Sequence, residues 1–461
     1  MQKIWPISRM FLIIATSAAS GAFAMTLLMR PESSPVPRPI VAAQPITAGS
    51  EVATVQPTAA GFEVATMQPT IVGPEIASVQ PTAASDIAIT PIPPLPADAF
   101  QERFDGQPTS PQPWNPPNWD VTVHSRDVDT WNQLEAMDAM HGADCGAPPA
   151  THKINSYEGA VFQCRDHMMT AINASGYGAI YLTPNQLADF SQREAIIRWD
   201  MSTLRSSGRD WVDLWISPFD EQLQLPLDLE VDLSGPPRNA VQIRMDLSRN
   251  AFTASIYRDF KEVEVEGEFS LQEYDSFLTP DAKRRDTFEV RINRTHLSVG
   301  MPGYGFKWID AEIPDLGWSQ GVVQFGHHSY NPSKDCSAPC GPNTWHWDNV
   351  QIAPTRPFTM IKADRRFIDA AVSSAVNLAR QTPKNAHLRF AGIGAGMELS
   401  FDDGKTWQPA QLQAQDSEFL KDEHFRSYWT PIPAGIQRVQ FRGQDWWGGS
   451  WYIRDISVWA Q

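Results

Sequence analysis

The chain has few basic residues for its length, and this shortage excludes one large class of partners. Its 461 residues contain 37 Lys and Arg against 53 Asp and Glu, which gives a formal net charge of -16 at pH 7. Nucleic-acid binding needs a basic surface that displaces counterions from phosphates. The composition therefore excludes nucleic acid as a partner, while the length is enough for two or three domains.

Cysteine is also scarce, with only Cys145, Cys164, Cys336 and Cys340 in the chain. None has the Cys-x-x-Cys spacing that is typical of zinc sites, so a Cys/His metal site is the weaker interpretation. An even number of cysteines in an exported chain is typical of disulfides. Three pairings are open, and the shortest loops favour Cys145–Cys164 together with Cys336–Cys340.

Charged residues are absent between Arg9 and Arg30. Lys3 and Arg9 precede this apolar run, and Ala22–Ala24 is a small-x-small cleavage site, so the run is typical of an export signal. Its 20 residues would also span a bilayer uncleaved. Residues 1–30 are therefore expected to be a signal peptide or a signal anchor. In both cases the rest of the chain lies outside the cytoplasm, either secreted or anchored at the cell surface, with the membrane as a partner if the segment is kept.

Aromatic residues are almost absent from residues 31–98, and a 12-residue unit carrying Gln-Pro-Thr recurs there from Gly49, Gly61 and Gly73. Proline recurs too often for a helix or a sheet. Such a segment cannot bury enough apolar surface to offset its ordering entropy. Residues 31–98 are therefore expected to form a disordered, extended stalk.

Helix-like patterns are scarce in the remaining sequence, and the clearest one, Thr130–Met140, is short. Short alternating or β-branched runs, separated by Gly, Pro and Asn, are typical of strands and recur over residues 100–354 and 356–461. Within the second range, Phe367–Ala379 fits a helix or a strand. The sequence therefore predicts an all-β protein with a large sandwich over residues 100–354 and a smaller one over residues 356–461.

Acidic and aliphatic residues alternate strictly from Leu227 to Leu233. On a strand, Asp228, Glu230 and Asp232 must share one face, because side chains alternate every two residues. Like charges in a row repel each other, so such a face is tolerated where it meets water, a sugar or a metal. A second acidic row over residues 262–268 is more typical of a solvated edge strand.

Tryptophan is plentiful, with 17 in the chain. Trp211 and Trp215 differ by four positions, so on a strand they share a face on which they could stack on a sugar ring. Burial in the core is the alternative, because Trp is highly buried on average. Trp446 and Trp447 are adjacent and cannot both point inward from one strand, which favours an exposed carbohydrate-binding or partner-binding edge, or a packed contact between domains.

The order of motifs in the larger domain resembles the concanavalin A-like lectin/glucanase superfamily, and within it the family 16 glycoside hydrolases. Besides the acidic row, the motifs are Phe104–Gly106, Trp211-x-x-x-Trp215, Asp286–Ile292 and Trp345–Val350. The resemblance implies a jelly roll of two curved antiparallel sheets whose concave face holds sugar.

The same resemblance implies a catalytic strand of the form Glu-x-Asp-x-Glu. By position, Asp228 would be the nucleophile, Glu230 its helper and Asp232 the acid/base, but all three residue types depart from the family pattern. Retaining chemistry needs two carboxyl groups about 5–5.5 Å apart. Positions i and i+4 of a strand lie roughly 13 Å apart at Cα, and Asp is one methylene shorter than Glu. The departure therefore favours a binding protein over an enzyme.

The resemblance also implies a structural calcium near Asp348, with Glu102 or Asp105 as a further ligand. Calcium takes about 6–8 oxygen ligands, so these few residues do not make a site by themselves, and no cofactor is required for a binding function. His327-His328 and His346 are candidate zinc ligands by residue type, but the first two are flanked by Gly326 and Tyr330 and are expected to be loop or hydrogen-bonding histidines.

Ser400–Trp407 fits the Asp-box pattern Ser-x-Asp-x-Gly-x-Thr-Trp. The pattern predicts a tight turn in which the Asp402 carboxylate caps the backbone, Gly404 takes a positive φ and Trp407 packs beneath. Because the box occurs only once, a propeller is disfavoured. Residues 356–461 instead resemble an immunoglobulin-like β-sandwich, and similar sandwiches serve as accessory or dimerisation modules.

The sequence thus predicts an exported, surface-presented carbohydrate-binding protein whose partner is a polysaccharide or glycan. One alternative is a glycoside hydrolase acting on a β-glucan or galactan through Asp228, Glu230 and Asp232. The other is a non-catalytic surface protein whose aromatic patches bind another chain.

Overall fold

The computed structural model describes residues 90–106, 112–125, 157–174, 177–205, 209–221, 237–246, 251–270, 285–330, 343–365, 367–369, 374–393, 396–413, 425–443 and 452–461. All of them belong to one compact unit that begins at Gln80. Strands account for nearly all of the regular structure, and the 3-10 turn η3 (Pro302–Tyr304) is the one helical element within these ranges. The predicted all-β fold class is therefore confirmed.

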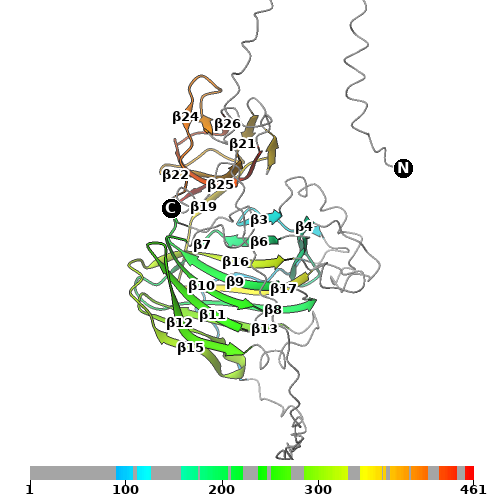
Figure 1. The fold of residues 1–461 in the computed structure, drawn as a ribbon, viewed down its shortest axis with the longest axis vertical. Helices are drawn as coiled ribbons and strands as arrows, with labels where there is room; N and C mark the ends of the chain where they lie inside the picture. Colours follow the sequence, from blue (N-terminus) through cyan, green and yellow to red (C-terminus); the bar gives the residue numbers. More distant parts are fainter. Residues whose placement is uncertain are drawn as a thin grey trace, which may run out of the picture. The chain divides into compact units, whose positions relative to one another are not determined.

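The larger sandwich has two antiparallel nine-stranded sheets in the described residues (Figure 1). Sheet A has the order β15-β14-β13-β8-β17-β5-β4-β2, with β1 also paired to β17. Its strands are β1 (Phe100–Glu102), β2 (Gln112–Pro113), β4 (Tyr157–Gln163), β5 (Met168–Ala174), β8 (Ala195–Arg205), β13 (Asp286–Ile292), β14 (His296–Met301), β15 (Phe306–Glu312) and β17 (Asn343–Ala353).

Sheet B has the order β12-β11-β10-β9-β16-β6-β3, with β7 paired to β16 and β18 paired to β7. Its strands are β3 (Trp119–Ser125), β6 (Tyr177–Pro184), β7 (Gln186–Asp189), β9 (Arg209–Ser217), β10 (Asn239–Asp246), β11 (Ala251–Arg258), β12 (Lys261–Ser270), β16 (Gln320–Tyr330) and β18 (Thr355–Pro357). Neighbouring strands are often distant in sequence, as in the jelly roll that the sequence predicts.

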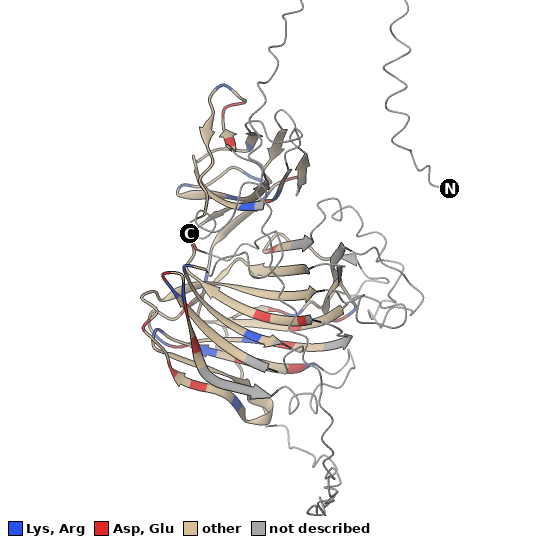
Figure 2. Cartoon of the chain, viewed as in Figure 1, with Lys and Arg blue, Asp and Glu red and all other residues tan. Residues whose placement is uncertain are grey.

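The core lies between sheets A and B and follows the two-residue period of the strands. On β9, Val212, Leu214 and Ile216 belong to this core, which also includes Ile197 and Trp199 of β8. The alternate residues of β9 therefore point to the outer face of sheet B. Figure 2 shows acidic and basic positions interspersed over the strands rather than gathered on one of them.

A second, smaller sandwich follows, made of a five-stranded sheet ordered β19-β27-β22-β25, with β20 paired to β27, and a four-stranded sheet ordered β21-β26-β23-β24. Its own core includes Leu388, Phe390 and Val458. Its strands are β19 (Thr359–Lys362), β20 (Phe367–Asp369), β21 (Ser374–Asn377), β22 (Ala386–Ile393), β23 (Glu398–Ser400), β24 (Gln408–Pro409), β25 (Phe425–Ile432), β26 (Arg438–Arg442) and β27 (Tyr452–Ala460). The described parts of Phe367–Ala379 contain strands β20 and β21.

Residues 90–98, which the sequence assigns to the stalk, are part of the described structure and contact the larger sandwich. The backbone N–H of Thr90 donates to the carbonyl of Gly303 at 2.7 Å, and the Arg198 guanidinium donates to the carbonyl of Pro93 at 2.6 Å. Proline-rich sequence can be ordered in this way because its carbonyls still accept hydrogen bonds from a folded partner.

The turn at Ser400–Trp407 is held by its own side chains. Asp402 accepts hydrogen bonds from the backbone N–H and the hydroxyl of Thr406, at 2.8 and 2.7 Å, and these bonds lower its pKa to about 2. Gly404 has a φ of 80°, and the indole N–H of Trp407 donates to its carbonyl at 3.1 Å. These contacts give the turn a structural role.

Candidate functional site

The outer face of sheet B carries polar and aromatic side chains from neighbouring strands. The cross-strand registers place Gln242 beside Trp215 and Trp215 beside Gln324. The next row places Asp213 beside Gly326. We refer to this surface as the polar face, and its members are Trp211, Asp213, Trp215, Gln242, Arg244, Ser255, Tyr257, Glu262, Gln324 and His328.

A continuous chain of hydrogen bonds crosses the polar face from β16 to β12. His328 Nε2 lies 3.0 Å from Asp213 Oδ2, and the same carboxylate accepts the Gln242 amide N–H at 3.1 Å. The Tyr257 hydroxyl lies 3.2 Å from both Gln242 Oε1 and Glu262 Oε1. Each of these side chains is therefore oriented by its neighbours before any ligand arrives.

A count of protons shows that this series of hydrogen bonds can accept a further donor. Burial raises the pKa of Tyr257, so the residue keeps its single hydroxyl proton at neutral pH. That proton faces two acceptors, Gln242 Oε1 and Glu262 Oε1, and Glu262 is also bonded to the Ser255 hydroxyl at 2.7 Å. A hydroxyl donates one hydrogen bond at a time. One of the two acceptors is thus left for another donor, such as a sugar hydroxyl.

Trp211 and Trp215 lie on the polar face and not in the core between the sheets. The Trp211 ring stacks on His328, with centroids 4.8 Å apart, and the Arg244 guanidinium lies 4.5 Å from its centroid. The Trp215 ring stacks on Tyr257 at 5.6 Å. Because neighbours occupy these ring faces, and the residues are 4% and 7% exposed, stacking of a sugar on either indole stays a prediction.

Gly326 allows the Asp213–His328 contact to form. A Cβ at this position would lie 2.0 Å from Asp213 Oδ1 and 2.7 Å from Tyr181 Cε1. We expect Gly326→Ala to lower the free energy of unfolding by about 1–3 kcal/mol, because packed side chains must move. Urea unfolding would measure the loss. In an Asp213→Ala background the same substitution should cost less, and an equal cost in both backgrounds would contradict this explanation.

His327, next to His328 in the sequence, points into the core and joins the two sheets. Burial lowers its pKa, so its imidazole is neutral at pH 7. Its Nε2 lies 3.0 Å from Asp210 Oδ1 and its Nδ1 lies 2.9 Å from the Thr170 hydroxyl. Asp210 also accepts the indole N–H of Trp345 at 3.0 Å, and Thr170 accepts that of Trp347 at 2.9 Å. This network is fully buried and is therefore structural.

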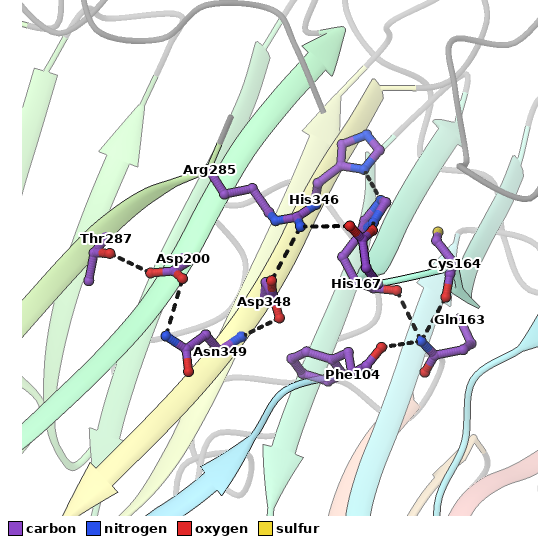
Figure 3. Close-up of polar contacts among 11 residues, drawn as sticks. Phe104, Gln163, Cys164, His167, Asp200, Arg285, Thr287, His346, Asp348 and Asn349 are labelled. Atoms are coloured by element: carbon purple, nitrogen blue, oxygen red, sulfur yellow. Dashed lines mark hydrogen bonds and ion pairs between the residues drawn. The ribbon is translucent and has the colours of Figure 1, made fainter. Parts of the chain in front are cut away.

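A second charged cluster lies on sheet A (Figure 3). Arg285 Nη2 is 3.3 Å from Asp348 Oδ2 and 3.5 Å from Asp166 Oδ2. His167 continues the cluster, with Nδ1 2.7 Å from Asp166 and Nε2 2.7 Å from His346 Nδ1. His346 and the pair 327–328 thus lie on strands, and not in loops, and all three take part in hydrogen bonds.

The predicted calcium ligands are bound to protein groups in this structure. Burial raises the pKa of Asp348 to about 6, although the Arg285 charge opposes this shift. Glu102 Oε1 accepts the backbone N–H of Phe104 at 3.2 Å. No group of three or more His, Cys, Asp or Glu within the described ranges is arranged to hold a metal ion. A calcium site at Asp348 and Glu102 stays a prediction.

Several predicted site residues lie outside the described ranges. They are the acidic row Asp228, Glu230 and Asp232, the pair Trp446 and Trp447, and the cysteines Cys145, Cys336 and Cys340. Cys164 is described and is disulfide-bonded. Its partner is one of those three cysteines, so the pairing stays a prediction.

The sequence interpretation missed most of the polar face. Asp213 stands midway between Trp211 and Trp215, so the two-residue period alone could have placed it on their face. Glu262 lies on the edge strand β12, as expected, yet it accepts hydrogen bonds from two side chains. Nothing in the local sequence of Gln242 indicates its position between Asp213 and Tyr257.

No family model and no curated protein matches this chain. Similar solved structures include LamAcat from Zobellia galactanivorans, with 9% identity, 55% of this chain and 96% of that one covered, and a TM-score of 0.34. The Bacteroides ovatus mixed linkage glucan PUL GH16 protein, solved with its product, has 12% identity, coverage of 55% and 99%, and a TM-score of 0.31. The carbohydrate binding module CBM66 from Bacillus subtilis has 12% identity, coverage of 40% and 84%, and a TM-score of 0.23. At these identities the likeness concerns the β-sandwich fold and not its site residues.

Proposed function

We propose that the protein binds a glycan on the polar face of sheet B. The observation that carries this proposal is the chain of hydrogen-bonded carboxylate, amide and phenol groups beside stacked aromatic rings. Sugar hydroxyls both donate and accept hydrogen bonds, and such preoriented groups match them with little loss of side-chain entropy. Gln242 is half-buried and Glu262 is exposed, so this part of the face is accessible.

The charge of the site supports a neutral glycan over an anionic one. Asp213 and Glu262 place two carboxylates in the network, against the Arg244 guanidinium that lies over Trp211. The chain as a whole carries a net charge of -16. An anionic sugar would be repelled by this field, whereas a neutral one donates its hydroxyls to the carboxylates.

The proposal includes presentation outside the cytoplasm. It is supported by the signal-like run before Arg30 and by the disulfide at Cys164, because disulfides persist in oxidising compartments. The described part of the chain has no helix with the length and hydropathy needed to cross a membrane.

A glycan array probed with the intact chain tests the proposal, and Gln242→Ala is the informative variant. The substitution removes an amide that bonds to Asp213 and Tyr257. We expect it to weaken glycan binding about tenfold, the effect of one lost hydrogen bond. Gln351→Ala is a matched control, because Gln351 lies on β17 of sheet A and bonds to Asn349.

Two outcomes of the glycan array would contradict the proposal. If no neutral glycan binds, or if Gln242→Ala and Gln351→Ala weaken binding equally, the polar face is not the binding site. A parallel assay for released reducing ends tests hydrolysis, which would require the carboxylates Asp228 and Asp232 to act in catalysis. If reducing ends are released and Asp228→Asn abolishes this release, the protein is a glycoside hydrolase and not only a binding protein.

A further inference from the structure

The smaller sandwich covers one side of the outer face of sheet B. Val322 is the cross-strand partner of Ser217, one row along from Trp215 and Gln324. Val322 and Leu187 do not join the core between sheets A and B. They form a separate buried cluster with residues of the smaller sandwich and of the segment leading to it, which are Phe358, Met360, Trp429 and Trp459.

Trp215, Gln242 and Gln324 belong to one row of cross-strand partners that runs across the outer face of sheet B. This row, called the Trp215 row, also ends at a contact with the smaller sandwich. Gln324 donates to the Thr183 hydroxyl at 3.2 Å, and Thr183 is the cross-strand partner of Asp120 on β3. The Asp120 carboxylate accepts a hydrogen bond from the guanidinium of Arg389 on β22. Arg389 also lies 4.9 Å from the centroid of the Trp459 ring. The row is therefore bounded by a buried ion pair.

Most of this row is buried, and only its β12 end is exposed among the described residues. Asp120, Thr183, Gln324, Trp215 and Ser255 are buried, Gln242 is half-buried, and Glu264 on β12 is exposed. Opening this side would break a buried ion pair and expose an apolar cluster to water, which is unfavourable. Within the described residues, the smaller sandwich therefore closes one side of the row, while its β12 end is exposed.

We infer that the polar face takes the end of a glycan chain and not its interior. This inference rests on the proposed function and adds the form of the ligand. The terminal sugar lies at Gln242 and Tyr257, where the spare acceptor is, and the rest of the chain leaves over Glu262 and Glu264. A chain that continued past Gln324 would meet the Asp120–Arg389 pair.

Length ladders of β-glucan and galactan oligosaccharides test this inference on the intact protein. Affinity should rise over the first few sugar units and then stay constant. A bulky fluorophore attached to one end of the chain should weaken binding at least tenfold, while the same group on the other end should have little effect. For long polymers, the number of proteins bound per chain should be independent of polymer length.

The outcomes separate the inference from the proposed function. Binding sites that increase in proportion to polymer length, or equal tolerance of a fluorophore at either end, would overturn chain-end recognition and leave glycan binding in place. Binding of none of the ladders, together with an empty glycan array, would overturn both. The measurements use the unaltered chain, so a variant that fails to fold cannot confuse them.

Discussion

Asp210→Ala is expected to lower the free energy of unfolding by about 2–6 kcal/mol, because it leaves two buried hydrogen-bond donors without their acceptor. The Asp210 side chain is fully buried and accepts hydrogen bonds from His327 and from the indole N–H of Trp345. Alanine would leave both donors buried without an acceptor, at about 1–3 kcal/mol each. Because these donors come from both sheets, their loss should loosen the packing of sheet A on sheet B.

Urea unfolding of the wild type and the variant would measure this loss. Asp315→Ala is a suitable control, because Asp315 forms an exposed ion pair with Arg294 on the surface of the same sandwich. The control should unfold at nearly the wild-type urea concentration. If Asp210→Ala were no more harmful than the control, the inner network would not join the two sheets.

Much of the fold could be predicted from local patterns. Alternation in segments such as Val241–Leu247 and Phe288–Ile292 predicted strands that the structure contains as β10 and β13. The same period places Trp211 and Trp215 on one face of β9. These predictions succeed because, in a strand with one buried face, the alternation of apolar and polar residues shows which side chains point to the core.

Contacts between distant residues could not be predicted in this way. The adjacent histidines 327 and 328 look alike in the sequence, yet one pairs with Asp210 in the core and the other with Asp213 on the polar face. Thr170, which completes the inner network, is 157 residues from His327. The alternation of side chains along a strand predicts that the two histidines point in opposite directions, but only the order of the strands in the sheets shows which residues each histidine contacts.

Segment ends were also beyond local reasoning. Composition alone assigned residues 90–98 to the stalk, because a proline-rich segment buries little surface by itself. Its contacts are with Arg198 of β8 and Gly303 of the turn η3, both far along the chain. The helix-or-strand ambiguity of Phe367–Ala379 was likewise resolved by the pairing of β20 with β27 and of β21 with β26.

The Arg389–Asp120 ion pair should give the second large effect. The partners are 269 residues apart, and both are buried where the smaller sandwich meets sheet B. Arg389→Ala would leave a carboxylate buried without its cation and is expected to cost about 3–5 kcal/mol. The double variant Asp120→Ala with Arg389→Ala should lose less than the sum of the two single variants, because neither residue is then left buried without its partner.

Urea unfolding would measure the cycle, with Arg438→Ala as the control, since Arg438 pairs with Asp403 on the exposed surface. Additive losses would show that the two charges do not interact.

The double variant also tests how long a glycan the Trp215 row can bind, because it removes the ion pair at the closed end of that row. If the ion pair limits the length of bound glycan, affinity in the double variant should keep rising along the oligosaccharide ladder where that of the wild type stays constant. If the ladder profile is unchanged although the pair is gone, the apolar cluster around Trp429 and Val322 must close this side alone.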